Sequence, residues 1–253
     1  MLKILSSTAA AESSSFDRSR RRDGEDNVQW LVRNGLNRED GTLVLLIGSR
    51  GHLPFRLRVA QSHLRHDLTP SYWSHVALLG PVGDDPASTT LYEISFEPPA
   101  GFAVPTTTNG LQRGRLGTYE DAVHHPNIAL LRLPVAAEVW QAPTTAGQIS
   151  VLERYQKQRS VLDATELLLE WLAFLWGVGH AGNPLLDGRG IPSAAMIESL
   201  LNAAGYDLTP SLESRASCPE AVWQAAKWWH PYYGDRNAAP IEGFWHTGHK
   251  IEL

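Results

Sequence analysis

The sequence predicts an α+β fold in which an antiparallel sheet packs against helices. Short, branched apolar runs bounded by turn residues lie in the first half of the chain, a pattern typical of buried strands. From about Ser150 onward, the apolar residues instead recur at helical spacing. Strands that come first and helices that follow are the pattern of an α+β domain. The 253 residues suit one sizeable domain better than two.

Four apolar runs predict the strands of this sheet, and we expect about four to six strands in all. The runs are Thr42–Ile47, Ser74–Gly80, Thr90–Ser95 and Ile128–Leu133. A turn-rich segment separates the second run from the third, which predicts an antiparallel hairpin with a long loop.

The best-marked helix is predicted over residues 192–205. Pro192 and Ser193 stand at its start, and Gly205 ends it. Its apolar stripe consists of Met196, Ile197, Leu200 and Leu201. Other helices are expected in residues 56–70, in residues 151–178 as two helices or one bent helix, and from Pro219 onward.

The two ends of the chain differ in composition. Residues 1–27 are rich in Ser, Ala, Arg and Asp and lack periodicity, so we expect a disordered tail. The remaining residues, 28–253, are expected to form a single domain with an aromatic-rich C-terminal extension. The aromatic residues there are expected to pack over the core, or to form a surface for a protein or a lipid.

Composition excludes several classes of protein. The net charge of −5 argues against a nucleic-acid partner, because such proteins usually carry a basic face. Cys218 is the single cysteine, so no disulfide framework is expected within the chain. The N-terminus makes a poor signal peptide, and the most apolar helix is too short for a transmembrane segment. A cytoplasmic protein, or one exported without an obvious signal, is expected.

His75 and Glu93 are the first candidates for chemistry. An imidazole inside an apolar strand is costly unless it is paired, and a carboxylate follows on the next strand. Each alone is more simply explained as a structural residue. Together, on adjacent strands, they could form a pair in which the carboxylate orients the ring and favours its charged form.

A nucleophile would have to come from elsewhere in the chain. The start of a helix suits one, because free N–H groups stabilise a thiolate or an oxyanion there. Ser193 and Cys218 both stand at such starts. Cys218 is favoured by residue type, since it is the only thiol, whereas Ser193 resembles an ordinary N-cap.

The order of these segments resembles the permuted papain-like (NlpC-type) hydrolases, in particular the YiiX/YebB-like group, over about residues 40 to 230. In that group a Ser-His strand carries the catalytic histidine, the next strand carries the third polar residue, and the nucleophile begins a late helix that ends at Ala-Gly. The resemblance therefore implies a site made of His75, Glu93 and Ser193, with Ser193 at the position of the family cysteine. Cys218 then becomes the second-choice nucleophile.

The resemblance implies a thiol-type amidase or peptidase that works through an acyl-enzyme. His75 would deprotonate the nucleophile, Glu93 would orient the imidazole, and backbone N–H groups near Ala194 would hold the oxyanion. A serine at position 193 would mark an inactivated Cys-to-Ser form, a natural serine enzyme or a decayed site. Ester or thioester hydrolysis, acyl transfer as in the related lecithin-retinol acyltransferase group, and a non-catalytic binding module are the alternatives.

Other patterns are weaker. His124, His125, His246 and His249 lack accompanying ligands at a known metal-site spacing, so no metal is expected, and no cofactor either. The Gly48–Gly51 segment has too few glycines, and no following Lys, for a phosphate loop. A peptide or an acylated small molecule is the expected substrate.

Overall fold

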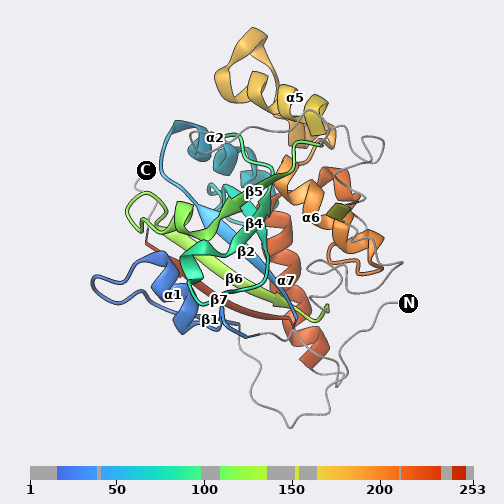
Figure 1. Ribbon diagram of the computed structural model, residues 1–253. Coiled ribbons are helices and arrows are strands. Elements are labelled where there is room, and N and C mark those ends of the chain that lie inside the picture. Colours follow the sequence, from blue (N-terminus) through green and yellow to red (C-terminus); the bar gives the residue numbers. More distant parts are fainter. Residues whose placement is uncertain are drawn as a thin grey trace.

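The computed structural model describes residues 16–38, 41–97, 109–135, 152–153, 164–210, 212–234 and 241–248. Its strands form one mixed sheet in the order β1-β7-β6-β2-β3-β4-β5 (Figure 1). The strands are β1 (Phe16–Arg18), β2 (Thr42–Gly48), β3 (His75–Leu79), β4 (Thr90–Glu93), β5 (Gln112–Arg115), β6 (Asn127–Leu133) and β7 (Glu242–Thr247).

The helices differ in length and position around this sheet. The α-helices are α1 (Asn27–Arg33), α2 (His52–Ala60), α5 (Ala164–Trp176), α6 (Pro192–Ala203) and α7 (Pro219–Gly234). Short 3₁₀ turns are η1 (Ser62–Leu64), η2 (Pro86–Ser88), η3 (Leu116–Tyr119), η4 (Val178–His180), η5 (Pro184–Asp187) and η6 (Ser214–Ala216). The α+β class expected from the sequence is therefore present.

The four predicted strands are all present, as β2, β3, β4 and β6. The expected hairpin is present as well, because β3 and β4 pair antiparallel, with Leu78 opposite Tyr92. Two expectations were wrong. The sheet has seven strands in the described residues rather than four to six, and β1 runs parallel to β7. The edge strands β1 and β5 carry charged residues, as edge strands often do, and so lack the apolar pattern that marks buried strands.

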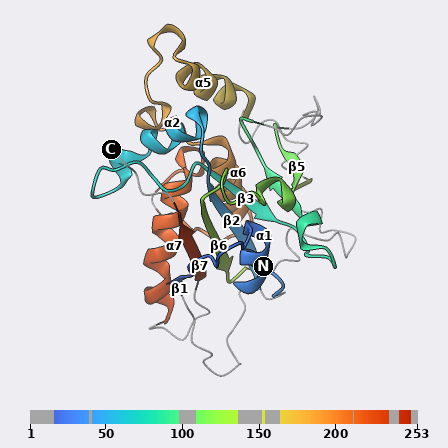
Figure 2. The same ribbon diagram turned by 90° about the vertical axis from the view of Figure 1, so that its left-hand side faces the viewer.

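Both faces of the sheet are covered. All seven residues of β2 are buried, which is expected of a strand at the centre of a two-sided sheet. On one face, α2, α5, α6 and α7 contribute side chains to the larger core. On the other face, α1 and η3 cover a smaller core (Figures 1 and 2). Each strand side chain in the centre of the sheet therefore belongs to one of two separate cores.

Helix α6 lies where the sequence predicted it. Pro192 is its first residue and Ile191 is the N-cap, so Ser193 is the second helical residue rather than the N-cap. Gly205 follows the C-cap with a φ of +81°, a conformation that favours glycine. The Tyr206 N–H then donates to the Leu201 carbonyl, which closes the helix end.

Of the tail expected up to residue 27, residues 1–15 lie outside the described residues, and residues 16–27 contact the sheet. β1 pairs with β7, and the Arg21 N–H donates to Nδ1 of His246 over 3.0 Å. The indole of Trp30 donates to the Ser19 carbonyl over 2.9 Å. Backbone pairing and polar contacts hold this segment, and neither leaves an apolar pattern in the sequence.

The aromatic residues near the C-terminus divide between the core and the surface. Trp223 of α7 is buried, and its ring lies 5.0 Å from that of Trp73. Trp245 lies in β7 and packs against Trp223. Trp228 of α7, in contrast, is 58% exposed. No helix in the described part of the chain is both long and apolar enough to cross a lipid bilayer.

Glu198 is a buried carboxyl group in α6. Its pKa is raised to about 7, mainly by burial; a hydrogen bond with Thr209 opposes this shift, and a nearby charge on Asp207 adds to it. Among the described residues, its Oε1 atom has no hydrogen-bond partner. Ionising Glu198 in the folded protein is therefore costly.

We predict that Glu198→Gln stabilises the protein at pH 8 but not at pH 4. The folded protein holds the Glu198 proton more tightly than the unfolded chain, so its stability falls as pH rises from about 4.5 to about 7. Glutamine removes this cost, which is on the order of 1–3 kcal/mol. Urea unfolding at both pH values measures the effect. An equal effect of the substitution at pH 4 and pH 8 would contradict it.

Candidate functional site

His75 and Glu93 form a buried pair at one end of the sheet. This is the end where β2 and β4 finish and where β3 and β6 begin. His75 Nε2 lies 2.7 Å from Glu93 Oε2, and the carboxylate is 1% exposed. Burial would raise the Glu93 pKa, but the contact with His75 and a hydrogen bond from Tyr119 lower it below its ordinary value. The contact predicted from the sequence is present.

Two further residues define the surroundings of the Glu93 carboxylate: one donates a hydrogen bond to it, and the other leaves room for it. The Tyr119 hydroxyl donates to Oε2 over 2.8 Å. A Cβ atom on Gly114 of the neighbouring strand would lie 2.5 Å from Oε1, so only glycine leaves room for the carboxylate there. The Tyr119 ring stacks near His75, with centroids 5.9 Å apart, and its other neighbour is His125 at 5.1 Å.

The His75 ring lies on the face of the sheet opposite α6. His75 pairs in register with Ile47, and Ile47 and Tyr119 both belong to the core beneath α1. Val76, the next residue of β3, belongs to the other core, together with Ala194 of α6. Because successive strand side chains point to opposite faces, the His75 ring points away from the helix that carries Ser193.

Ser193 and Ala194 are both completely buried. Among the described residues, the Ser193 hydroxyl has no hydrogen-bond partner, so no base is in contact with it. The backbone before it is tightly enclosed, since a Cβ atom on Gly190 would lie 2.3 Å from the Ser217 carbonyl oxygen. The structure therefore brings His75 and Glu93 together but does not bring Ser193 to them.

Cys218 is also unsuited to act as a nucleophile. Its thiol is completely buried, and this burial raises its pKa to about 12. The charges of Glu220 and Glu198 act in the same direction as burial. A thiol with such a pKa provides almost no thiolate at neutral pH. Cys218 is a core residue in this structure.

A serine–histidine pair that the sequence analysis missed lies at the same end of the sheet. Ser49 Oγ is 2.8 Å from Nδ1 of His125, and both side chains are half-buried. The Thr118 backbone lies near the ring and favours its protonated form. In the tautomer that carries the proton on Nε2, Nδ1 accepts a hydrogen bond from the Ser49 hydroxyl.

His125 is neutral in its surroundings. Burial lowers its pKa to about 4, and the nearby His124 and His75 lower it as well. The charge of Asp121 and the Thr118 carbonyl act in the opposite direction. A neutral imidazole in hydrogen-bond contact with a serine hydroxyl is the arrangement of a nucleophile and its base.

Local backbone geometry presents Ser49 between a strand and a helix. β2 ends at Gly48, where a Cβ atom would clash with the Tyr72 carbonyl oxygen. The Ser49 N–H donates to Ser74 Oγ over 3.1 Å. Gly51, with a φ of +114°, is the N-cap of α2. The signal in the sequence is the segment Gly48–Gly51, which places a serine between a strand and a helix.

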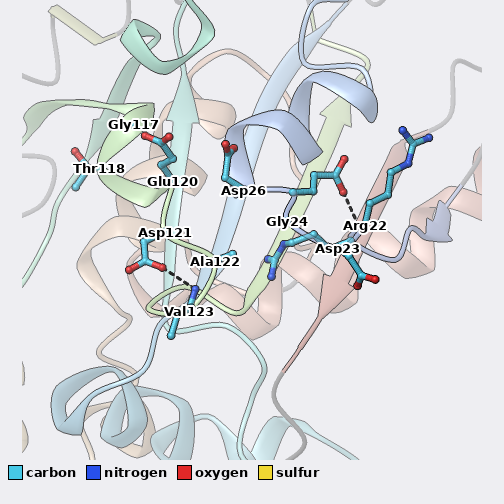
Figure 3. A pocket seen from close by; sticks show the side chains of 12 residues that line it. Arg22, Asp23, Gly24, Asp26, Gly117, Thr118, Glu120, Asp121, Ala122 and Val123 are labelled. Carbon is cyan, nitrogen blue, oxygen red and sulfur yellow. Dashed lines mark hydrogen bonds between the residues drawn. The ribbon is translucent and has the colours of Figure 1, made fainter.

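A pocket of about 730 Å³ is lined by residues 21–26, 117–118 and 120–123 (Figure 3). Neither Ser49 nor His125 lines it, although residues 120–123 of its wall come just before His125 in the chain. Several of its carboxylates serve local structure. Asp26 caps α1, Asp121 accepts from the Val123 N–H, and Glu25, whose pKa is lowered to about 2 by Arg33, is ion-paired. Its acidic character is therefore largely structural.

Among the described residues, no group of three His, Cys, Asp or Glu side chains is arranged to hold a metal ion. His246 accepts a hydrogen bond from the Arg21 backbone, and His124 is exposed. His249 lies outside the described residues.

Comparison with known proteins adds no assignment. No protein-family model matches the chain. No curated protein and no solved structure matches it either. The resemblance to permuted papain-like hydrolases therefore stays a prediction, and the function has to be inferred from the side chains.

We predict that a cysteine introduced by Ser193→Cys does not react with iodoacetamide in the folded protein. Position 193 is completely buried and faces away from His75, so the thiol is neither accessible nor activated. Ser88→Cys, at an exposed position, is the matched control and should react readily. If position 193 were labelled rapidly and His75→Ala abolished this labelling, the result would contradict the prediction and favour a thiol-hydrolase site made of residue 193, His75 and Glu93.

Proposed function

We propose that the chain hydrolyses an amide or ester bond through an acyl-enzyme formed on Ser49. The single observation that carries the proposal is the 2.8 Å contact between Ser49 Oγ and His125 Nδ1. Among the described residues, this is the hydrogen bond that joins a serine hydroxyl to an imidazole nitrogen. Hydrolysis through an acyl-enzyme is also the reaction expected from the sequence, but the proposed nucleophile is Ser49 instead of Ser193.

In the proposed reaction, Ser49 Oγ attacks the substrate carbonyl carbon while its proton passes to His125 Nδ1. The tetrahedral adduct collapses, and the proton moves from His125 to the departing amine or alcohol. Water then attacks the acyl-serine ester, His125 accepts the proton of that water, and the acid leaves with Ser49 restored.

The start of α2 supplies donors for the negative charge that develops on the substrate oxygen. The first turn of a helix carries N–H groups without partners inside the helix. Here these are the N–H groups of His52 and Leu53, which follow Ser49 closely in the chain. The helix dipole adds a partial positive charge at the same end.

The pair of His75 and Glu93 has a positioning role in this proposal. Glu93 fixes the Tyr119 hydroxyl, and the Tyr119 ring packs edge-on against His125. The chain of contacts from Glu93 through Tyr119 holds the imidazole in reach of Ser49. His75 and Glu93 touch no reacting atom in this scheme.

The finer fold assignment, a permuted papain-like domain, stays a prediction within this proposal. The contact of His75 with Glu93 across β3 and β4 supports it. The position of Ser193 in the opposite core does not. A peptide or an acylated small molecule remains the proposed substrate, and acyl transfer to an acceptor other than water is the alternative outcome of the same acyl-enzyme.

A second candidate function is a non-catalytic binding module. The observation that favours it is the complete burial of Ser193 and Cys218, which removes both nucleophiles expected from the sequence. It differs from the hydrolase proposal in one respect, since it requires that Ser49 be no more reactive than any other surface serine.

We predict that a fluorophosphonate probe labels Ser49 in the folded protein. Ser49→Ala should abolish labelling, and His125→Ala should lower its rate by about 100-fold or more, as expected for loss of a general base. His124→Ala, an exposed neighbour, is the matched control and should label normally. Mass mapping identifies the site. Absence of labelling, or labelling that survives His125→Ala, would favour the binding module.

We also predict that the rate at which the probe labels Ser49 stays high down to an unusually low pH. His125 can accept a proton only when it is neutral, and its pKa is lowered to about 4. The labelling rate should therefore hold between pH 8 and pH 5 and fall as pH drops through about 4. A rate that already falls near pH 6.5, the ordinary histidine value, would contradict the role given to His125.

A further inference from the structure

His125 stands at the end of a surface loop between η3 and β6. The side chains of residues 120–124 are exposed or half-buried, so apolar packing does little to fix the course of this loop. For the proposed reaction, however, the His125 ring has to stay within hydrogen-bond reach of Ser49. On the side of the serine, the Arg50 N–H donates to the His124 carbonyl over 2.8 Å. The position of the loop therefore depends on polar contacts with its backbone.

Asn27 of α1 contacts both ends of this loop. Its side-chain Nδ2 donates to the Tyr119 carbonyl over 2.8 Å and to the His125 carbonyl over 2.9 Å. Its backbone N–H donates to the Glu120 carbonyl over 3.0 Å. Asn27 is the first residue of α1 and is 1% exposed. One buried residue thus joins the start of the loop to its end.

The neighbours of the Asn27 side chain fix the direction of its amide. Two carbonyl oxygens face its nitrogen and can only accept, while the Arg21 guanidinium faces its oxygen and can only donate. Arg21 also donates to the Pro126 carbonyl, next to His125, over 3.4 Å. The Asn27 amide therefore has both of its donors and its acceptor engaged, and a buried network satisfied in this way is rigid.

Helix α1 provides a fixed support for Asn27. The Asp26 side chain accepts from the Gln29 N–H over 2.7 Å, and the Gln29 side chain accepts from the Asp26 N–H over 3.2 Å, which is a capping box. Trp30 and Leu31 are completely buried in the core beneath the helix. Capping and burial together hold the start of α1, so Asn27 has a defined place against the loop.

We propose that Asn27 is a positioning residue for the hydrolysis assigned to Ser49. The inference rests on that proposed function, since Asn27 keeps the base within reach of the nucleophile. Asn27 touches no reacting atom and acts through the backbone of His125. Without its amide, the Tyr119 and His125 carbonyls lose the donor that they share, and the loop is free to move away from Ser49.

The pKa of His125 reports the position of its ring. Burial is the main cause that lowers this pKa to about 4, and the nearby His124 and His75 act in the same direction, against the charge of Asp121. A loop released from Asn27 would expose the ring to water, and its pKa would rise towards the ordinary value of about 6.5. A general loss of stability that leaves the loop in place would not change the pKa of His125.

The test compares two substitutions in α1 of the full chain. Asn27→Ala removes the amide that holds the loop. Asn34→Ala is the matched control, because it removes another buried amide of the same helix, one that donates to the Trp30 carbonyl over 2.7 Å. In an NMR titration, with the His125 signal assigned from His125→Ala, the His125 pKa should rise by about one to two pH units in Asn27→Ala and stay unchanged in Asn34→Ala.

Two outcomes would overturn the inference: an unchanged His125 pKa in Asn27→Ala, or an equal rise in Asn34→Ala. If Asn27→Ala does not fold, Asn27→Ser is the second variant, and its shorter hydroxyl should give a rise in the same direction. The rate at which a fluorophosphonate labels Ser49 should also fall in Asn27→Ala, by about tenfold at pH 5 and by less at pH 8. Asn34→Ala should be labelled normally.

Failure of the two proposals can be told apart. A wild-type protein that the probe does not label at Ser49 would contradict the hydrolase proposal. The NMR titration needs no activity and still decides whether Asn27 holds His125. Labelling of the wild type together with an unaffected Asn27→Ala would contradict the role of Asn27 alone.

Discussion

The alternation of side chains along β3 is the constraint on which the candidate site depends. Both faces of the sheet are covered, so each residue of this strand has to enter one core or the other. Val76 and Leu78 enter the core that contains α6, and His75 therefore enters the opposite one. A shift of register by one residue would turn His75 toward α6, but it would also move every apolar residue of β3 to the wrong face.

The core beneath α1 accepts His75 because polar partners are already present there. Glu93 accepts hydrogen bonds from both the imidazole and the Tyr119 hydroxyl, and Gly114 leaves the space that the carboxylate needs. Such a network is stable only when each member has its partners, because an unpaired buried carboxylate would be costly. The same network packs against His125, so the buried pair and the pair formed by Ser49 and His125 belong to one continuous polar cluster.

The sequence by itself determined the strands β2, β3, β4 and β6 and the helix α6, because apolar spacing and the residues at the ends of these elements report burial directly. It also predicted that His75 and Glu93 would meet, since neighbouring strands of a hairpin bring such residues within reach. Only the tertiary structure decided which face His75 would take, because that depends on the register with β2 and on which helix covers which face. The pairing of Ser49 with His125 was likewise decided there, since it joins residues 76 positions apart through loops that carry no apolar pattern.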